Sequence, residues 1–117
     1  MKTRVVHCKE QEFDVYIGRA MQGFPASKWA NNHRIGPDGT RDEVCDKHEQ
    51  DFLSNPERYA ELPELRGKVL GCWCKTKRAP LTRCHGDTYI KHLLLMFPED
   101  AAEQDAVQGQ SGQLNLF

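Results

Sequence analysis

The residues best suited to chemistry lie in one short segment, 71–87, which reads Gly-Cys-Trp-Cys-Lys-Thr-Lys-Arg-Ala-Pro-Leu-Thr-Arg-Cys-His-Gly-Asp. It holds three of the five cysteines of the chain, and a histidine directly follows the third. Lysines and arginines fill the stretch between these cysteines. Clustered cations are costly to desolvate, and they lower the pKa of nearby thiols. The segment therefore predicts a reactive thiolate or a set of soft metal ligands rather than an ordinary core loop.

One interpretation of this segment is a zinc site. Cys72 and Cys74 are two residues apart, so their side chains share one face if the backbone is extended. Cys84 and His85 could return to that face and complete a tetrahedral set of four ligands. Structural zinc sites more often use Cys-x2-Cys or wider steps, so the spacing alone leaves the assignment open.

A second interpretation makes Cys84 a nucleophile at the start of a helix. The helix dipole and the neighbouring Arg83 would lower its thiol pKa, and His85 or Asp87 would serve as the acid–base partner. A third interpretation is purely structural, with the first two cysteines a buried strand residue and a turn residue. The sequence does not separate these three interpretations.

The charges are segregated along the chain. No acidic residue occurs between Asp14 and Asp38, or between Glu64 and Asp87, whereas both stretches carry cations. If the two stretches meet at one end of a sheet, they form a positive cleft suited to a nucleotide or a nucleic acid, with an aromatic plane for stacking. Solvated surface charges and a core tryptophan are the alternative. The predicted ligand-binding residues are Arg19, Lys28, Trp29, Arg78 and Arg83.

Hydrophobic spacing predicts a small single α/β domain over residues 1–97, with a short sheet and flanking helices. Thr40 and Glu43 form a capping box, so a helix should begin directly after them. Cys45 and His48 lie on that helix and could add ligands, although free cysteine at such a position is more typical of a core. The expected helices cover about 41–53, 56–62 and 85–97, the expected strands lie around 5–6, 13–17 and 68–73 with a turn near 11–12, and a long irregular loop covers 18–39.

The bulk composition predicts a cytoplasmic protein with free thiols. At 117 residues and a net charge of -1, the chain fits one ordinary domain rather than a uniformly basic nucleic-acid coat. Its longest apolar run, 93–97, is far too short to span a membrane, and its first residues lack a secretory signal. Without an export signal, five cysteines are better explained as thiols or ligands than as a disulfide framework.

The C-terminal part of the chain combines a polar stretch with an apolar end. Residues 98–112 are acidic and then rich in Gln, Gly and Ser, which predicts a flexible, disordered linker. Residues 113–117 resemble the bacterial sliding-clamp-binding motif of the Gln-Leu-Ser/Asp-Leu-Phe type. Folding of this tail back onto the domain is the alternative. The resemblance implies that the DNA polymerase sliding clamp is bound by Gln113, Leu114, Leu116 and Phe117.

A second resemblance covers most of the chain, roughly residues 13–96. It rests on Tyr-Ile-Gly-Arg at 16–19, Gly-Cys-Trp-Cys at 71–74 and Cys-His-Gly-Asp at 84–87, together with the segments 27–29, 38–41 and 62–68. These motifs are similar to those of an uncharacterised domain family of bacteria and their phages. The resemblance implies a small α/β domain in which the two cysteine motifs face the Tyr-Ile-Gly-Arg strand end, and it implies no activity.

Three functional hypotheses follow from these observations. The first is a replication-associated phage or mobile-element protein that docks on the sliding clamp and binds a nucleotide or nucleic acid in its basic Cys/His cleft. Whether such a cleft is catalytic is left open. The second is a non-enzymatic phage effector that blocks the clamp groove. The third is a zinc-stabilised interaction module.

Overall fold

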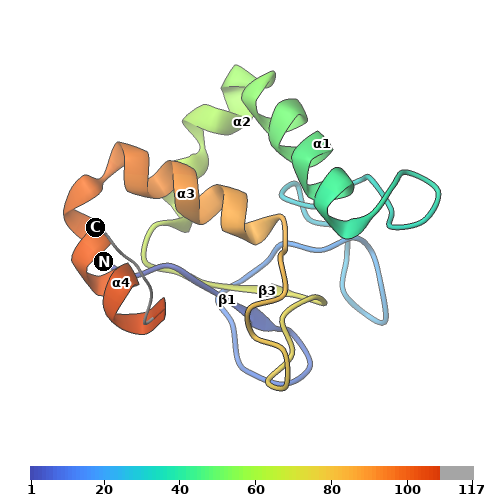
Figure 1. Ribbon diagram of the computed structural model, residues 1–117, viewed down its shortest axis with the longest axis horizontal. Coiled ribbons are helices and arrows are strands. Elements are labelled where there is room, and N and C mark those ends of the chain that lie inside the picture. The colour runs from blue at the N-terminus through green and yellow to red at the C-terminus, as the bar shows by residue number, and fades with distance from the viewer. Residues whose placement is uncertain (109–117) are drawn as a thin grey trace.

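All three strands of the sheet run parallel to one another. In the computed structural model, which describes residues 1–108, the strands are β1 (Arg4–His7), β2 (Val15–Tyr16) and β3 (Val69–Cys72) (Figure 1). β3 lies in the centre, and its Leu70 pairs with both Val5 and Val15. Because the strands are parallel, their carboxyl ends lie at the same edge of the sheet. Tyr16 is paired there with Gly71.

The first two strands are neighbours in sequence but not in the sheet. A turn follows β1, where the Gln11 N–H donates to the His7 carbonyl at 3.1 Å. The chain then returns along the sheet, because the Asp14 N–H donates to the Val69 carbonyl at the start of β3, at 2.7 Å. Parallel strands need such a return crossing instead of a tight hairpin. The predicted strands and the turn between them are therefore present, with β3 inserted between them.

The helices match the sequence patterns closely. α1 (Arg41–Leu53) has the predicted bounds, and its capping box is formed by Thr40 and Glu43. α3 (Gly86–Met96) ends before Pro98, as predicted. None of the helices within residues 1–108 is long and apolar enough to cross a membrane. The remaining helical segments are α2 (Pro56–Ala60), η1 (Leu62–Leu65), η2 (Pro98–Asp100) and α4 (Ala101–Gln108).

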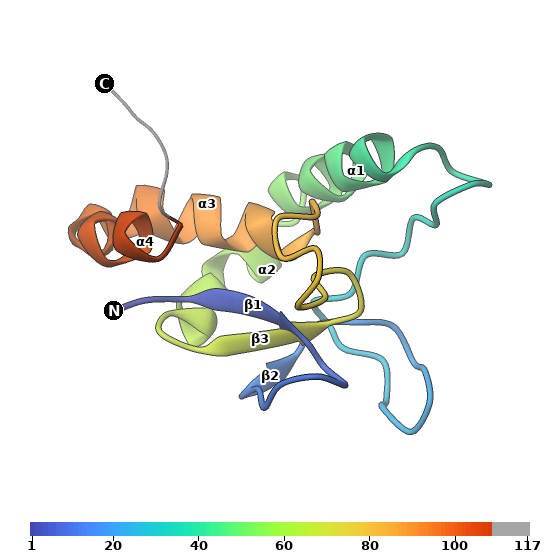
Figure 2. The same cartoon turned by 60° about the horizontal axis from the view of Figure 1, so that its bottom comes forward.

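The core fills the space between the sheet and the helices α1 and α3, which lie on one side of it (Figure 2). Trp29, from the long loop before α1, belongs to this core and is only 2% exposed. Its ring meets the Tyr89 ring edge-on at 5.2 Å, and the Tyr89 hydroxyl donates to the Trp29 carbonyl at 2.7 Å. The loop is thereby anchored under α3. The other core side chains include Ile17, Phe52, Leu62, Leu65, Leu70 and Leu93.

The segment 98–108 is helical, which differs from the flexible linker predicted for 98–112. Its Asp100 is 4% exposed and accepts hydrogen bonds from Arg66 Nε at 2.9 Å and Nη2 at 3.0 Å. The amino group of Met1 also donates to Asp100, at 2.9 Å. Partners this distant in sequence cannot be recognised from local composition. Residues 109–117, which include the predicted clamp-binding peptide, lie outside the described residues.

Replacing Asp100 with Asn should therefore destabilise the domain. Arg66 and the N-terminal amino group hold the pKa of the Asp100 carboxyl well below its usual range. A lowered pKa in the folded state stabilises the protein above the unfolded-state pKa of about 3.9, and this contribution is lost as the pH falls below about 4. Thermal unfolding should give a lower Tm for Asp100→Asn at pH 7, and a smaller difference at pH 3.

Glu99→Gln is the matched control for this prediction. Glu99 also pairs with Arg66, at 3.2 Å, but its side chain is 66% exposed. Exposed ion pairs contribute little to stability, so its Tm should stay close to that of the parent protein. Equal losses in the two variants would contradict the role assigned to Asp100.

Candidate metal and ligand site

Three cysteines meet at the carboxyl edge of the sheet. Cys72 is the last residue of β3, and Cys74 follows two residues later. Cys84 stands two residues before Gly86, where α3 begins. Their three sulfur atoms all lie within 4.8 Å of one another, and those of Cys72 and Cys84 are 3.2 Å apart. The zinc interpretation requires Cys74 and Cys84 to come within reach of each other, and the structure confirms that they do. A cluster of this kind could hold a metal ion.

The loop between the cysteines is closed by polar contacts. Lys75, whose side chain is 11% exposed, donates to the Thr82 carbonyl at 2.6 Å and pairs with the Asp87 carboxylate at 3.0 Å. Asp87 also accepts from the backbone N–H of Cys84 at 3.1 Å. One interpretation of the sequence makes Asp87 an acid–base partner of the Cys84 thiol. The structure places its carboxylate against the backbone and against Lys75, where it positions Cys84.

His85 is held in one orientation by a backbone carbonyl. Its Nε2 lies 2.7 Å from the Ile17 carbonyl oxygen, so Nε2 carries the proton and Nδ1 has a free lone pair. Nδ1 faces the Cys84 sulfur at 3.6 Å. Burial lowers the pKa of His85, which keeps the ring neutral at physiological pH. A neutral Nδ1 can accept the Cys84 S–H proton in a hydrogen bond or approach a metal ion.

The three thiols of the cluster differ in acidity because they hydrogen-bond to one another. Hydrogen bonds from Cys72 and Cys84 lower the pKa of the Cys74 thiol, and the guanidinium of Arg41 acts in the same direction. The same interactions raise the pKa of Cys84, and burial raises it further. These opposite shifts favour a single thiolate shared within the cluster, and three sulfur atoms this close together can all contact one bound cation.

The Tyr-Ile-Gly-Arg strand end packs directly against the cysteine motifs, as the family resemblance implies. The Trp73 indole N–H donates to the Tyr16 hydroxyl at 2.7 Å, and Tyr16 in turn donates to the Arg19 carbonyl. Gly18 is required at this corner, because a Cβ there would lie 2.5 Å from the Tyr16 hydroxyl oxygen. The corner fixes the backbone that carries Arg19 toward the cysteines.

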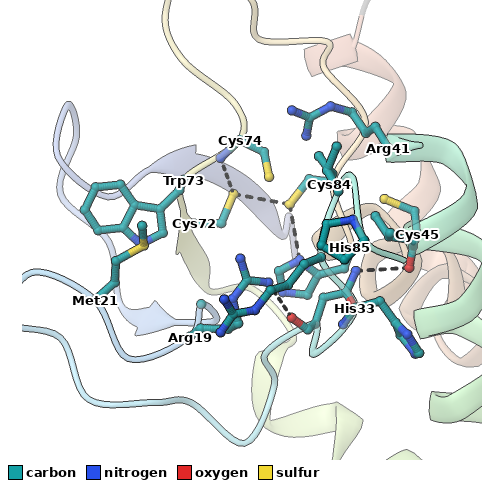
Figure 3. A pocket seen from close by; sticks show the side chains of 16 residues that line it. Arg19, Met21, His33, Arg41, Cys45, Cys72, Trp73, Cys74, Cys84 and His85 are labelled. Atoms are coloured by element: carbon teal, nitrogen blue, oxygen red, sulfur yellow. Dashed lines mark hydrogen bonds between the residues drawn. The ribbon is translucent and has the colours of Figure 1, made fainter. Parts of the chain in front are cut away.

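A cavity of about 460 Å³ opens over this cluster (Figure 3). Its lining includes the three clustered cysteines and three arginines, Arg19, Arg34 and Arg41. Within residues 1–108, no acidic residue lines it. Arg19 donates to the Asn31 carbonyl, and Arg41 donates to the Arg83 carbonyl. Across the part of the chain that the structure describes, none of the three arginines forms an ion pair with a carboxylate.

The cations that the sequence analysis selects are mostly elsewhere. Of the five predicted ligand-binding residues, Arg19 alone lines the cavity. Lys28 pairs with Glu61 and Glu64, and Arg83 pairs with Asp42 and Asp46. Arg78 is exposed on the loop between the cysteines, and the Trp29 ring is buried in the core, where it has no face free for stacking on a base.

Two pocket arginines were missed by the sequence analysis. Arg34 lies in the first acid-free stretch, and this position is the sequence feature that could have indicated a role in ligand binding. Arg41 is the first residue of α1, and helix position alone does not indicate a ligand. Cys45 also lines the cavity, and burial raises its thiol pKa. His48 points into the core, where its Nε2 lies 2.8 Å from the Tyr89 hydroxyl.

Comparison with known proteins assigns the chain to a family. Residues 2–94 match the model of the domain of unknown function DUF4326, so the chain belongs to that family. It is 38% identical over 88 residues to "Uncharacterized protein R718" of Acanthamoeba polyphaga mimivirus, covering 69% of this chain and 67% of that protein. It is 33% identical over 107 residues to the "Uncharacterized 12.4 kDa protein in nrdA-td intergenic region" of Enterobacteria phage T4, covering 87% of each. No solved structure matches the chain significantly.

Proposed function

We propose that the cavity binds a small anionic ligand, with nucleotides as the class that fits best, beside a zinc ion held by the cysteine cluster. The observation that carries this proposal is the group of three arginines without carboxylate partners, gathered around one cavity within the described residues. Other cations of the domain, such as Arg66 and Arg83, are neutralised by acidic side chains. Cations without carboxylate partners that face one cavity favour an anion as its occupant.

The size and lining of the cavity support a nucleotide as the ligand. Cavities that bind small molecules typically range over about 300–1,000 Å³ and combine apolar walls with a few polar groups. Here Met21, Trp73 and Ile35 supply apolar surface beside the arginines. A ring system and a phosphate would match these two kinds of lining. Nucleic acid ends carry the same chemistry and are included in the test below.

Replacing Arg34 with Gln should weaken nucleotide binding by about 10-fold to 100-fold, because a hydrogen bond to a charged group contributes about 1.5–3 kcal/mol. Arg34 suits this test because its side chain is exposed and makes no hydrogen bond within the described residues. The measurement is calorimetric titration of adenosine monophosphate, and of a short single strand of DNA, at low and at physiological ionic strength. Binding should weaken as the salt concentration rises.

Arg78→Gln is the matched control. It removes the same charge from an exposed side chain that does not line the cavity. Its affinity should equal that of the parent protein once the change in net charge is screened by salt. If Arg78→Gln weakens binding as much as Arg34→Gln, the ligand does not occupy the cavity. Absence of binding at low salt would support the interaction-module hypothesis instead.

Zinc is the ion that we propose for the cluster, because zinc commonly binds thiolate sulfur in tetrahedral sites. Elemental analysis of the freshly purified protein should give about one zinc per chain. Cys74→Ser should lower this content strongly, because it removes one of the three clustered sulfur atoms. Cys8→Ser is the control, since Cys8 is buried outside the cluster. Full zinc content in Cys74→Ser would contradict the proposed site.

We also propose that residues 113–117 bind the bacterial sliding clamp. This proposal rests on the resemblance of Gln-Leu-Asn-Leu-Phe to the clamp-binding motif. α4, the last described helix, lies at the end of the domain where Met1 and Asp100 meet. The cavity is lined by residues at the start of α1 and directly before α3, and the starts of these two helices lie away from α4 in Figure 1. Docking of the peptide would therefore leave the cavity free to act on a ligand.

Replacing both Leu116 and Phe117 with Ala should abolish clamp binding within the detection range of calorimetry. Each buried Leu or Phe side chain contributes about 1.5–3 kcal/mol, so the double variant should lose about 3–6 of the roughly 8 kcal/mol that a micromolar contact provides. The Tm and the nucleotide affinity of the variant should not change. Equal clamp binding by both proteins, or unfolding of the variant, would mean that the tail belongs to the domain. Inhibition of polymerase loading by a variant that lacks Arg34 would favour the clamp-blocking hypothesis.

A further inference from the structure

We propose that the zinc ion keeps its fourth coordination position open toward the cavity, and that an anionic oxygen of the ligand takes this position. The inference rests on the zinc and ligand proposals above and names how the two meet. It narrows the ligand class to molecules with a terminal phosphate or carboxylate. Zinc sites that act on ligands typically use three protein ligands and leave one position for water or substrate.

The number of protein donors supports an open position. Among the described residues, the mutually close ligand atoms are the three sulfurs of Cys72, Cys74 and Cys84. His85 Nδ1 approaches the Cys84 sulfur at 3.6 Å but is not part of the mutually close set. Cys45 lines the cavity and is also outside that set.

His85 has little freedom to swing into the cluster. Its Nε2 is tied to the Ile17 carbonyl at 2.7 Å. The next residue, Gly86, packs so closely that an added Cβ would lie 2.7 Å from Val5 Cγ2 and 3.0 Å from Ile17 Cδ1. The ring and the backbone that carries it are therefore both held, and Nδ1 remains beside one sulfur only.

The three sulfurs also border the cavity, so a ligand in the cavity can reach the open coordination position. Cys72, Cys74 and Cys84 all belong to the cavity lining, and Figure 3 shows their sulfurs pointing toward one another, with Arg41 and Arg19 on either side. A Zn²⁺ ion with three thiolates carries a net charge of -1, so an anion binds to it only with cations nearby. Arg41 lies beside Cys74 and offsets the charge of the thiolates. Arg19 and Arg34 also line the cavity and are available to bind the anionic ligand.

The test replaces zinc by Co²⁺ in the full-length protein and follows the visible absorption of the metal. Inorganic phosphate and adenosine monophosphate are then titrated separately, with calorimetry run in parallel. We expect each to shift the Co²⁺ bands with the same midpoint as the calorimetric binding curve. Arg34→Gln should raise that midpoint about 10-fold or more, whereas Arg78→Gln should leave it unchanged at physiological salt.

The outcomes separate the two proposals. Calorimetric binding without any change in the Co²⁺ bands would mean that the ligand enters the cavity but not the metal, which overturns the inference and leaves the proposed function intact. Failure to bind Co²⁺ would overturn the zinc proposal and the inference together. Band shifts with phosphate but none with adenosine monophosphate would mean that the open position accepts a free anion only, and would overturn the nucleotide assignment.

His85 is the competing fourth ligand, and it has its own readout. A histidine bound to Co²⁺ through Nδ1 gives a strongly shifted proton signal from its Nε2–H in the paramagnetic NMR spectrum, and here that proton is held by Ile17. We expect no such signal. Its presence would show a closed site of three cysteines and one histidine, and would overturn the inference. His85→Gln, where it folds, should keep the response of Co²⁺ to phosphate.

Discussion

The close approach of α3 to the carboxyl edge of the sheet is the constraint on which the site depends. Gly86 is the first residue of α3, and it has no room for a Cβ against Val5 and Ile17. This contact brings the start of the helix against β1 and against Ile17, the residue that follows β2. Cys84 is thereby placed 3.2 Å from Cys72. Cluster, cavity and the fixed His85 ring all follow from this one contact.

Carboxyl ends of parallel strands are a common position for binding sites in α/β proteins, and the domain follows that rule with a very small sheet. The rest of the structure braces this edge. Lys75 closes the loop between the cysteines through Thr82 and Asp87, and the Trp29 ring anchors the long loop that carries Arg34. The opposite end is closed by the contact of Asp100 with Arg66 and the N-terminus.

Local sequence patterns were sufficient where the structure depends on neighbouring residues. The capping box at Thr40 and Glu43 fixed the start of α1, and the apolar spacing before Pro98 predicted α3. The proximity of Cys74 and Cys84 was also predictable, because a short loop joins the end of a strand to the start of a helix. Tertiary contacts decided the rest. The helical segment after Pro98 depends on partners about a hundred residues away, such as Asp100 with Met1.

Charge segregation pointed to a cation-rich site, but most of the residues that it selected do not line the cavity. Lys28 and Arg83 lie in loops and pair with carboxylates of η1 and α1, and these pairings arise only when the chain is folded. The sequence left open whether Trp29 stacks on a base or packs in the core. Its edge-on contact with Tyr89 places the ring in the core. Arg34 and Arg41 gain their significance from the cavity that they share with the cysteines.

X-ray absorption at the zinc edge of the ligand-free protein tests the central claim most directly, because it counts the atoms around the ion. The account predicts three sulfur scatterers at about 2.3 Å and one oxygen or nitrogen scatterer at about 2.0–2.1 Å. Addition of phosphate should leave the sulfur shell unchanged and add a phosphorus contribution beyond the first shell. Four sulfur scatterers, or a histidine ring pattern that phosphate does not displace, would contradict an open three-cysteine site.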